Sequence, residues 1–88
     1  MKLVLAIVND EDAESVLSEL IGNEFRVTRI ASTGGFLRRG NTTLLIGVED
    51  EKVDQAIDVI RNATIPTDGH SMFRATVFVL PVSHFEQF

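Results

Sequence analysis

The sequence predicts an α+β domain in which two helices cover one face of an antiparallel four-stranded sheet. Three observations predict this class. Four segments have the apolar, β-branched character of strands, two segments repeat apolar residues at helical spacing, and the order along the chain is β-α-β-β-α-β. The chain has 88 residues, 44% of them hydrophobic and 24% charged, so residues 1–88 are expected to form one domain with a single core.

The first strand is predicted at residues 3–8, which are continuously apolar, as is typical of a strand in the middle of a sheet. The next segment has the i, i+3, i+4, i+7 apolar spacing of a helix. Asn9 or Asp10 is expected to cap its start, and Gly22-Asn23 to end it. Its first turn is rich in carboxylates: Asp10, Glu11, Asp12 and Glu14. Negative charge there complements the helix dipole, which favours a structural role over catalysis.

Residues 25–32 are predicted as the second strand, with a slip in alternation between Val27 and Ile30 that indicates a bulge. Residues 42–48 are the third strand. Asp50 is then expected to cap a second helix, whose apolar face contains Val53, Ala56, Ile57 and Ile60. Residues 73–82 are the fourth strand, in which Pro81 fits only near the end or on an edge. This order predicts the ferredoxin-like plait, with both helices on one side because crossovers are right-handed.

Both faces of the predicted sheet carry apolar residues, since Val4, Ala6 and Val8 alternate with a second apolar set at positions 3, 5 and 7. Two helices on one side leave the other face uncovered. A large apolar sheet face in water is unfavourable, so other subunits are expected to cover it, with a loosely covered monomer as the alternative.

The segment Thr33–Thr43, sequence TGGFLRRGNTT, combines glycines, arginines, hydroxyls and an aromatic residue between the second and third strands. Glycine permits close backbone approach to a ligand, arginine binds phosphate, and a loop phenylalanine can lie against a base, so the segment indicates a nucleotide ligand. The segment lacks the Gly-Lys-Ser/Thr ending of a Walker phosphate-binding loop. It also lacks the Gly-x-Gly-x-x-Gly spacing of a dinucleotide-binding turn.

The charge distribution supports an anionic small molecule. Residues 25–48 contain four arginines and no Asp or Glu, so this window carries +4 in a chain of net charge −5. The four are Arg26, Arg29, Arg38 and Arg39. The acidic remainder would repel a long nucleic-acid backbone, so no nucleic-acid polymer is expected as a partner. The alternative is that these arginines bind no ligand and only form a charged, solvent-exposed face on two strands and their connection.

Other functional classes are disfavoured. The absence of cysteine agrees with a cytoplasmic location, and the apolar run at residues 3–8 is too short for a signal peptide or a membrane helix. His70 and His84 lie far apart without nearby ligands, so no metal site is expected. No catalytic set is visible, and the protein is not expected to be an enzyme.

The chain resembles the PII-like cyclic di-AMP receptor family. The resemblance rests on Met1–Val8, the Thr33–Thr43 run, Gly47-Val48, Ala75–Val82 and the closing Phe85–Phe88. It implies a homotrimer that binds cyclic di-AMP, with no other cofactor, in clefts between neighbouring subunits and signals to a downstream protein of unknown identity.

The resemblance also implies roles for eight residues. Arg26 and Thr28 would line the cleft, and Gly47 would leave room for a base. Asn41 would hydrogen-bond at the ligand, and Phe36 and Leu37 would pack on an adenine. From the other side of the cleft, Phe78 would contribute apolar surface and Gln87 would hydrogen-bond an adenine.

The chain departs from the family at residues 62–72, which form a short connection where the family usually carries a much longer loop. This shortening is either natural or engineered. Because that loop borders the ligand cleft in the family, two functions remain open. The first is a receptor for cyclic di-AMP or a related adenine nucleotide. The second is a structural or protein-interaction trimer that has lost nucleotide response.

Overall fold

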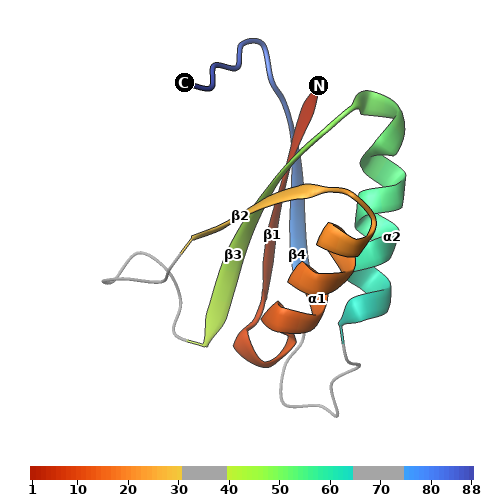
Figure 1. The fold of residues 1–88 in the computed structure, drawn as a ribbon. Coiled ribbons are helices and arrows are strands. Elements are labelled where there is room, and N and C mark those ends of the chain that lie inside the picture. The colour runs from red at the N-terminus through yellow and green to blue at the C-terminus, as the bar shows by residue number, and fades with distance from the viewer. Residues whose placement is uncertain (31–39, 65–74) are drawn as a thin grey trace.

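The computed structural model describes residues 1–30, 40–64 and 75–88. The elements follow the predicted order: β1 (Lys2–Asn9), α1 (Asp10–Gly22), β2 (Arg26–Ile30), β3 (Asn41–Val48), η2 (Asp50–Lys52), α2 (Val53–Ala63) and β4 (Ala75–Pro81). Figure 1 shows the two helices packed on the same face of one sheet.

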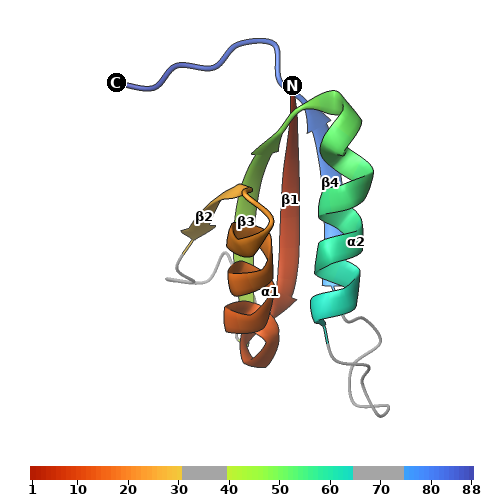
Figure 2. The ribbon, with the colours of Figure 1, turned by 45° about the vertical axis from the view of Figure 1, so that its right-hand side comes forward.

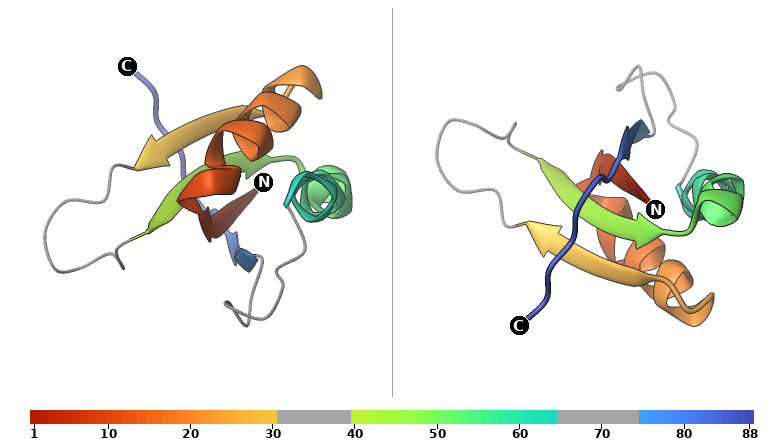
Figure 3. Two further views of the ribbon diagram at one scale, coloured as in Figure 1. Left: turned by 90° about the horizontal axis from the view of Figure 1, so that it is seen from below. Right: turned by 90° about the horizontal axis from the view of Figure 1, so that it is seen from above.

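The four strands form a single sheet in the order β2-β3-β1-β4, and each neighbouring pair is antiparallel. The first strand therefore lies inside the sheet, while β2 and β4 are its edges. Figure 2, turned by 45° from Figure 1, shows that the helices form one layer and the sheet the other. The views from below and from above show the same two layers (Figure 3). The ferredoxin-like prediction is confirmed.

The core lies between the sheet and the helices. The register places Val4 of β1 beside Ile46 of β3, and Ala6 beside Leu44, and all four side chains are buried. From the helices, Val16 and Leu20 of α1 and Ala56 and Ile60 of α2 are buried against them. Burying one such aliphatic side chain contributes about 1.5–3 kcal/mol, so this interface defines the packing of the layers.

The end of α1 is where the sequence predicted it, and Glu24 then reverses the chain. The helix ends at Gly22 as expected, but the left-handed residue that reverses the chain is Glu24, at φ 69°. The amides of Glu24 and Phe25 donate to the carbonyls of Ile21 and Leu20, at 2.9 and 3.0 Å, which terminates the helix. Glycine is the usual residue at such a position, and here a glutamate adopts this conformation.

The start of α1 is held by a different residue from the predicted cap. Asn9 occupies the cap position, but its side chain makes no capping hydrogen bond. Instead, the backbone amide of Asp10 donates to the carbonyl of Gly40 at 2.8 Å. Gly40 has φ +90°, a conformation that favours glycine, and it joins the start of β3 to the start of α1.

Two further predictions are wrong. Arg26–Ile30 pairs with β3 in an unbroken register, so β2 has no bulge: Ile30 lies on the same face as Arg26 and Thr28. Asp50 does not cap α2, because the turn η2 precedes that helix. The carboxylate of Asp50 lies 3.0 Å from the amino group of Met1, and the hydrogen bond and charge of that ammonium lower the pKa of Asp50. Pro81 is the last residue of the edge strand β4, as predicted.

Candidate functional site

The face of the sheet turned away from the helices is uncovered in the single subunit, and we refer to it as the open face. Antiparallel partners point to the same side of a sheet, so the register assigns its members. They are Leu3, Leu5, Ile7, Arg26, Thr28, Ile30, Asn41, Thr43, Leu45, Gly47, Thr76, Phe78 and Leu80. Apolar residues predominate, and Phe78 and Leu80 are 51% and 43% exposed.

Three of the predicted binding residues are brought together at the edge formed by β2 and β3. Arg26 is the direct partner of Gly47, and Thr28 follows two residues later on the same face. All three are exposed. A guanidinium and a hydroxyl beside a glycine provide hydrogen-bond donors next to open backbone, an arrangement that suits an anionic ligand with a planar ring.

Gly47 creates a notch in the open face. It lies between Arg26 on β2 and Leu3 on β1, and a Cβ atom built on it meets no other atom within 4 Å. Both neighbours carry long side chains, so the missing side chain leaves a low point between them. The predicted role of Gly47, to leave room for a base, fits this geometry.

Asn41 and Phe78 share the open face but lie away from this cluster. Asn41 begins β3 six residues before Gly47, which corresponds to roughly 20 Å along an extended strand. Phe78 is three strands from Thr28 in the same cross-strand row, a separation of roughly 14 Å. The most exposed apolar side chains of the open face, Phe78 and Leu80, are therefore on β4, whereas Arg26 and Thr28 are on the opposite edge strand, β2.

The last predicted residue with described coordinates, Gln87, belongs to an extended tail. The amide of Val82 donates to the carbonyl of Met1 at 3.2 Å, and residues 83–88 are all exposed. Figure 1 shows this tail leaving the end of the sheet. Phe36 and Leu37 lie outside the described residues, as do Arg38 and Arg39.

The two described arginines of the basic window have different roles. Arg29 points to the helix side of β2, where its Nη1 lies 2.6 Å from Oε1 of Glu14. Arg26 points to the open face and forms no ion pair with any described residue. Of these two arginines, Arg26 is therefore the one whose guanidinium lies on the open face without a described ion pair.

The acidic first turn of α1 is largely explained by structural contacts. Oδ1 of Asp10 accepts a hydrogen bond from Oγ1 of Thr42 at 2.6 Å, and Glu14 pairs with Arg29. Asp12 is 1% exposed, and its Oδ1 has no hydrogen-bond partner among the described residues. The structure thus links this turn to β2 and β3, in agreement with the structural interpretation.

Within residues 1–30, 40–64 and 75–88, no cluster of three or more metal-ligating side chains is found. His84 has only Glu86 nearby, with Nε2 and Oε2 3.4 Å apart, and His70 lies outside the described residues. In the same part of the chain, no helix has the length and apolar character needed to cross a membrane.

Sequence reasoning missed the residues that flank the cluster. Leu45 lies between Thr28 and Leu5, and Leu3 lies beside Gly47, so both form walls of the same surface. The available signal was the alternation of β3, which puts Leu45 on the side of Gly47.

The fold and the open face define a ferredoxin-like domain with a small polar group of residues, Arg26 and Thr28, at one edge of a mainly apolar sheet face. The cyclic-di-AMP receptor family model matches residues 1–70, and the chain belongs to this family. A solved structure, of a functionally unknown protein from Pediococcus pentosaceus ATCC 25745, is 39% identical with a TM-score of 0.78. The match covers 99% of this chain and 96% of that one.

The comparisons also bear on the short connection before β4. The family match ends at residue 70, within the 62–72 segment that departs from the family pattern.

Proposed function

We propose that this protein is a receptor for cyclic di-AMP that binds the nucleotide between subunits of a homotrimer, without catalysing a reaction. The observation that carries the proposal is the grouping of Arg26, Thr28 and Gly47 on an open face in which apolar residues predominate. Membership of the cyclic-di-AMP receptor family supports the choice of ligand.

The separation of the predicted residues supports a site built from two subunits. In one chain, Phe78 lies roughly 14 Å from Thr28, and Gln87 lies in an exposed tail. A second copy would bring its own β4 and tail to the Arg26 edge of the first. The apolar residues of the open face would then be covered by protein.

The length of the surface also suits a ligand with two bases. Gly47 offers a notch at one end of β3, whereas Asn41 lies at the other end and follows Phe36 and Leu37 in the sequence by only a few positions. One adenine would lie over Gly47, and the other would contact Phe36 and Leu37. The guanidinium of Arg26 and the hydroxyl of Thr28 would donate to phosphate oxygens.

Calorimetry with cyclic di-AMP, cyclic di-GMP, ATP and AMP tests the proposal. Cyclic di-AMP should release heat, and Arg26→Ala should weaken its binding about tenfold or more, the loss expected for a charge-assisted hydrogen bond. Arg29→Ala is the matched control because it removes the same charge from the helix side of the same strand. Phe78→Ala and Gln87→Ala should also weaken binding.

The oligomeric state is tested separately by a mass measurement in solution, where a trimer is expected. A trimer that gives no heat with any of the four nucleotides would refute the receptor and leave the alternative, a structural or protein-interaction trimer. The short 62–72 connection, where the family match ends, favours that alternative if binding fails.

A further inference from the structure

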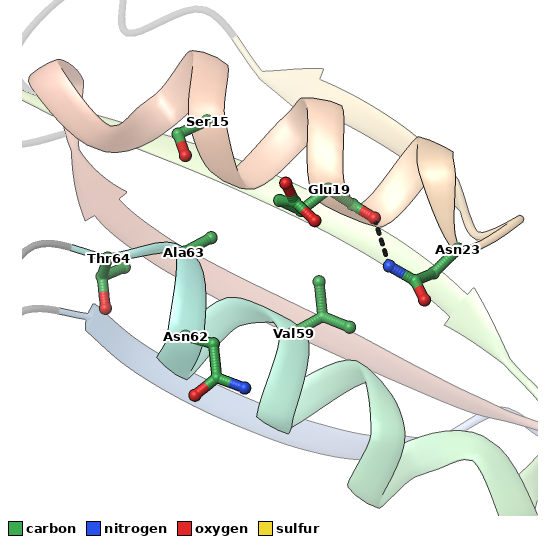
Figure 4. Close-up of a pocket in the computed structure, with 7 residues that line it drawn as sticks. All are labelled: Ser15, Glu19, Asn23, Val59, Asn62, Ala63 and Thr64. Atoms are coloured by element: carbon green, nitrogen blue, oxygen red, sulfur yellow. Dashed lines mark hydrogen bonds between the residues drawn. The ribbon is translucent and has the colours of Figure 1, made fainter.

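An open groove of about 730 Å³ lies between the two helices, on the layer opposite the open face (Figure 4). Glu19 and Asn23 line it from α1, and Val59, Asn62 and Ala63 line it from α2. Val59 and Ala63 are half-buried and give the groove an apolar part, while the two asparagines and the carboxylate are exposed. A volume in this range suits a ligand or a peptide side chain with its flanking residues.

The electrostatics of the groove favour a cation. Glu19 is the one charged residue among the described residues that line the groove, and α1 contains no lysine or arginine. The groove also reaches Asn62 and Ala63 in the last turn of α2, where the helix dipole presents its negative end. A positive group would therefore be attracted by a side-chain charge and by backbone carbonyls together.

The described cations of the chain do not neutralise this groove. Arg61 is paired with Asp58, with 3.0 Å between Nη1 and Oδ1, and Arg29 is paired with Glu14. Glu19 forms no ion pair with any described residue. In Figure 4 its carboxylate lies between the two helices.

We infer that the groove receives an arginine side chain from an exposed segment of a partner protein. The aliphatic stem of the arginine would lie on Val59 and Ala63, and its guanidinium would bind the Glu19 carboxylate. Nδ2 of Asn23 donates to the backbone carbonyl of Glu19 at 2.8 Å, which leaves Oδ1 of Asn23 to accept from the guanidinium. A planar group with five donors suits these acceptors better than the compact ammonium of lysine.

This docking surface is independent of the nucleotide site. The open face and the helices lie on opposite sides of the sheet, so subunits or nucleotide on the open face would leave the groove accessible (Figure 2). A failed nucleotide titration would not remove the groove, and a failed peptide titration would not remove the receptor function.

Nuclear magnetic resonance on the full chain tests the inference with a capped Gly-Arg-Gly peptide. Its control is the same peptide with citrulline, which has nearly the shape of arginine but no charge. The arginine peptide should shift the amide signals of Glu19, Asn23 and residues 59–64, and the citrulline peptide should bind more weakly. Glu19→Gln should weaken arginine-peptide binding about fivefold, the value of one exposed ion pair near the upper end of its range.

Glu11→Gln is the matched control variant, because it removes one exposed carboxylate from the same helix without touching the groove. The Glu11→Gln variant should bind the arginine peptide with the same affinity as the original chain. Thermal unfolding should confirm that both the Glu11→Gln and the Glu19→Gln variants remain folded. Three results would overturn the inference. They are shifts outside the groove or none at all, equal binding of the two peptides, and equal weakening by Glu11→Gln and Glu19→Gln.

Discussion

Replacing Gly47 with alanine separates the demands of the fold from those of the proposed ligand. Gly47 lies in the extended strand β3, and a Cβ atom at this position meets nothing within 4 Å in the subunit. Alanine therefore fits without strain. The new methyl group would fill part of the notch between Arg26 and Leu3.

Gly47→Ala should change the stability of the domain mainly through the conformational entropy of the unfolded chain. Alanine has fewer backbone conformations than glycine, so Gly47→Ala should raise the free energy of unfolding by about 0.5–1 kcal/mol. In a domain of this size, that corresponds to a Tm higher by about 2–8 °C. Chemical and thermal unfolding without nucleotide both measure it.

The effect on binding should have the opposite sign. If an adenine lies over Gly47, the methyl group displaces it, and overpacking of about 1–3 kcal/mol weakens cyclic di-AMP binding by about tenfold or more. Calorimetry measures this change. Gly22→Ala is the control, because its Cβ also meets nothing within 4 Å but lies at the end of α1.

Unchanged cyclic di-AMP affinity in Gly47→Ala would refute the placement of a base at the notch. Lower stability of the nucleotide-free variant would refute the premise that the notch is empty, and it would indicate that another subunit packs against Gly47. Gly22→Ala should leave the affinity unchanged, so a loss of binding there would make the Gly47 result uninformative about the notch.

Three further predictions concern stability. Glu24→Gly should raise the free energy of unfolding by about 1 kcal/mol by removing the left-handed strain at φ 69°, while Glu24→Ala should not; equal gains would contradict the strain argument. Thr42→Val should cost about 1–2 kcal/mol in urea unfolding because the Asp10 carboxylate loses its donor, and Thr42→Ser should restore most of it. The Met1 ammonium lowers the pKa of Asp50 in the folded state, so this pair stabilises the fold above the unfolded pKa of 3.8 and is lost as the pH falls through the lower folded pKa. Asp50→Asn should flatten the pH dependence of unfolding in that acidic range, and an unchanged slope would contradict the contact.

The sequence predicted the element order and the apolar face of the second helix, because the period of the apolar residues differs between strands and helices. The side of each β1 residue was predictable in the same way, since Val4, Ala6 and Val8 alternate with the open-face set. The chain reversal after α1 was not, because Glu24 adopts a conformation that glycine normally takes. The bulge in β2 was wrongly predicted because Arg29, on the helix side, is held by Glu14 and not by apolar packing.

The candidate site was less accessible to sequence reasoning because it depends on pairing between strands. Arg26 and Gly47 are 21 positions apart, and only the antiparallel register places them side by side. The sequence analysis treated the arginines of residues 25–48 as one region of positive charge. In the structure, the two described arginines lie on opposite sides of the sheet, Arg26 on the open face and Arg29 on the helix side. The family resemblance pointed to Arg26 and Gly47 as site residues, and the register of β2 against β3 shows that they are neighbours.

The distribution of residues on the open face suggests how a trimer and a ligand can share it. Phe78 and Leu80 on β4 are large and apolar, and they gain stability when another protein surface covers them. Arg26 and Thr28 on β2 lose hydration when buried, and a purely apolar neighbour cannot replace it. In the proposed receptor, a phosphate-bearing ligand at that edge would supply acceptors for both donors. If the receptor proposal holds, nucleotide binding should complete a subunit interface that protein contacts alone leave poorly satisfied, and cyclic di-AMP should therefore stabilise the proposed trimer.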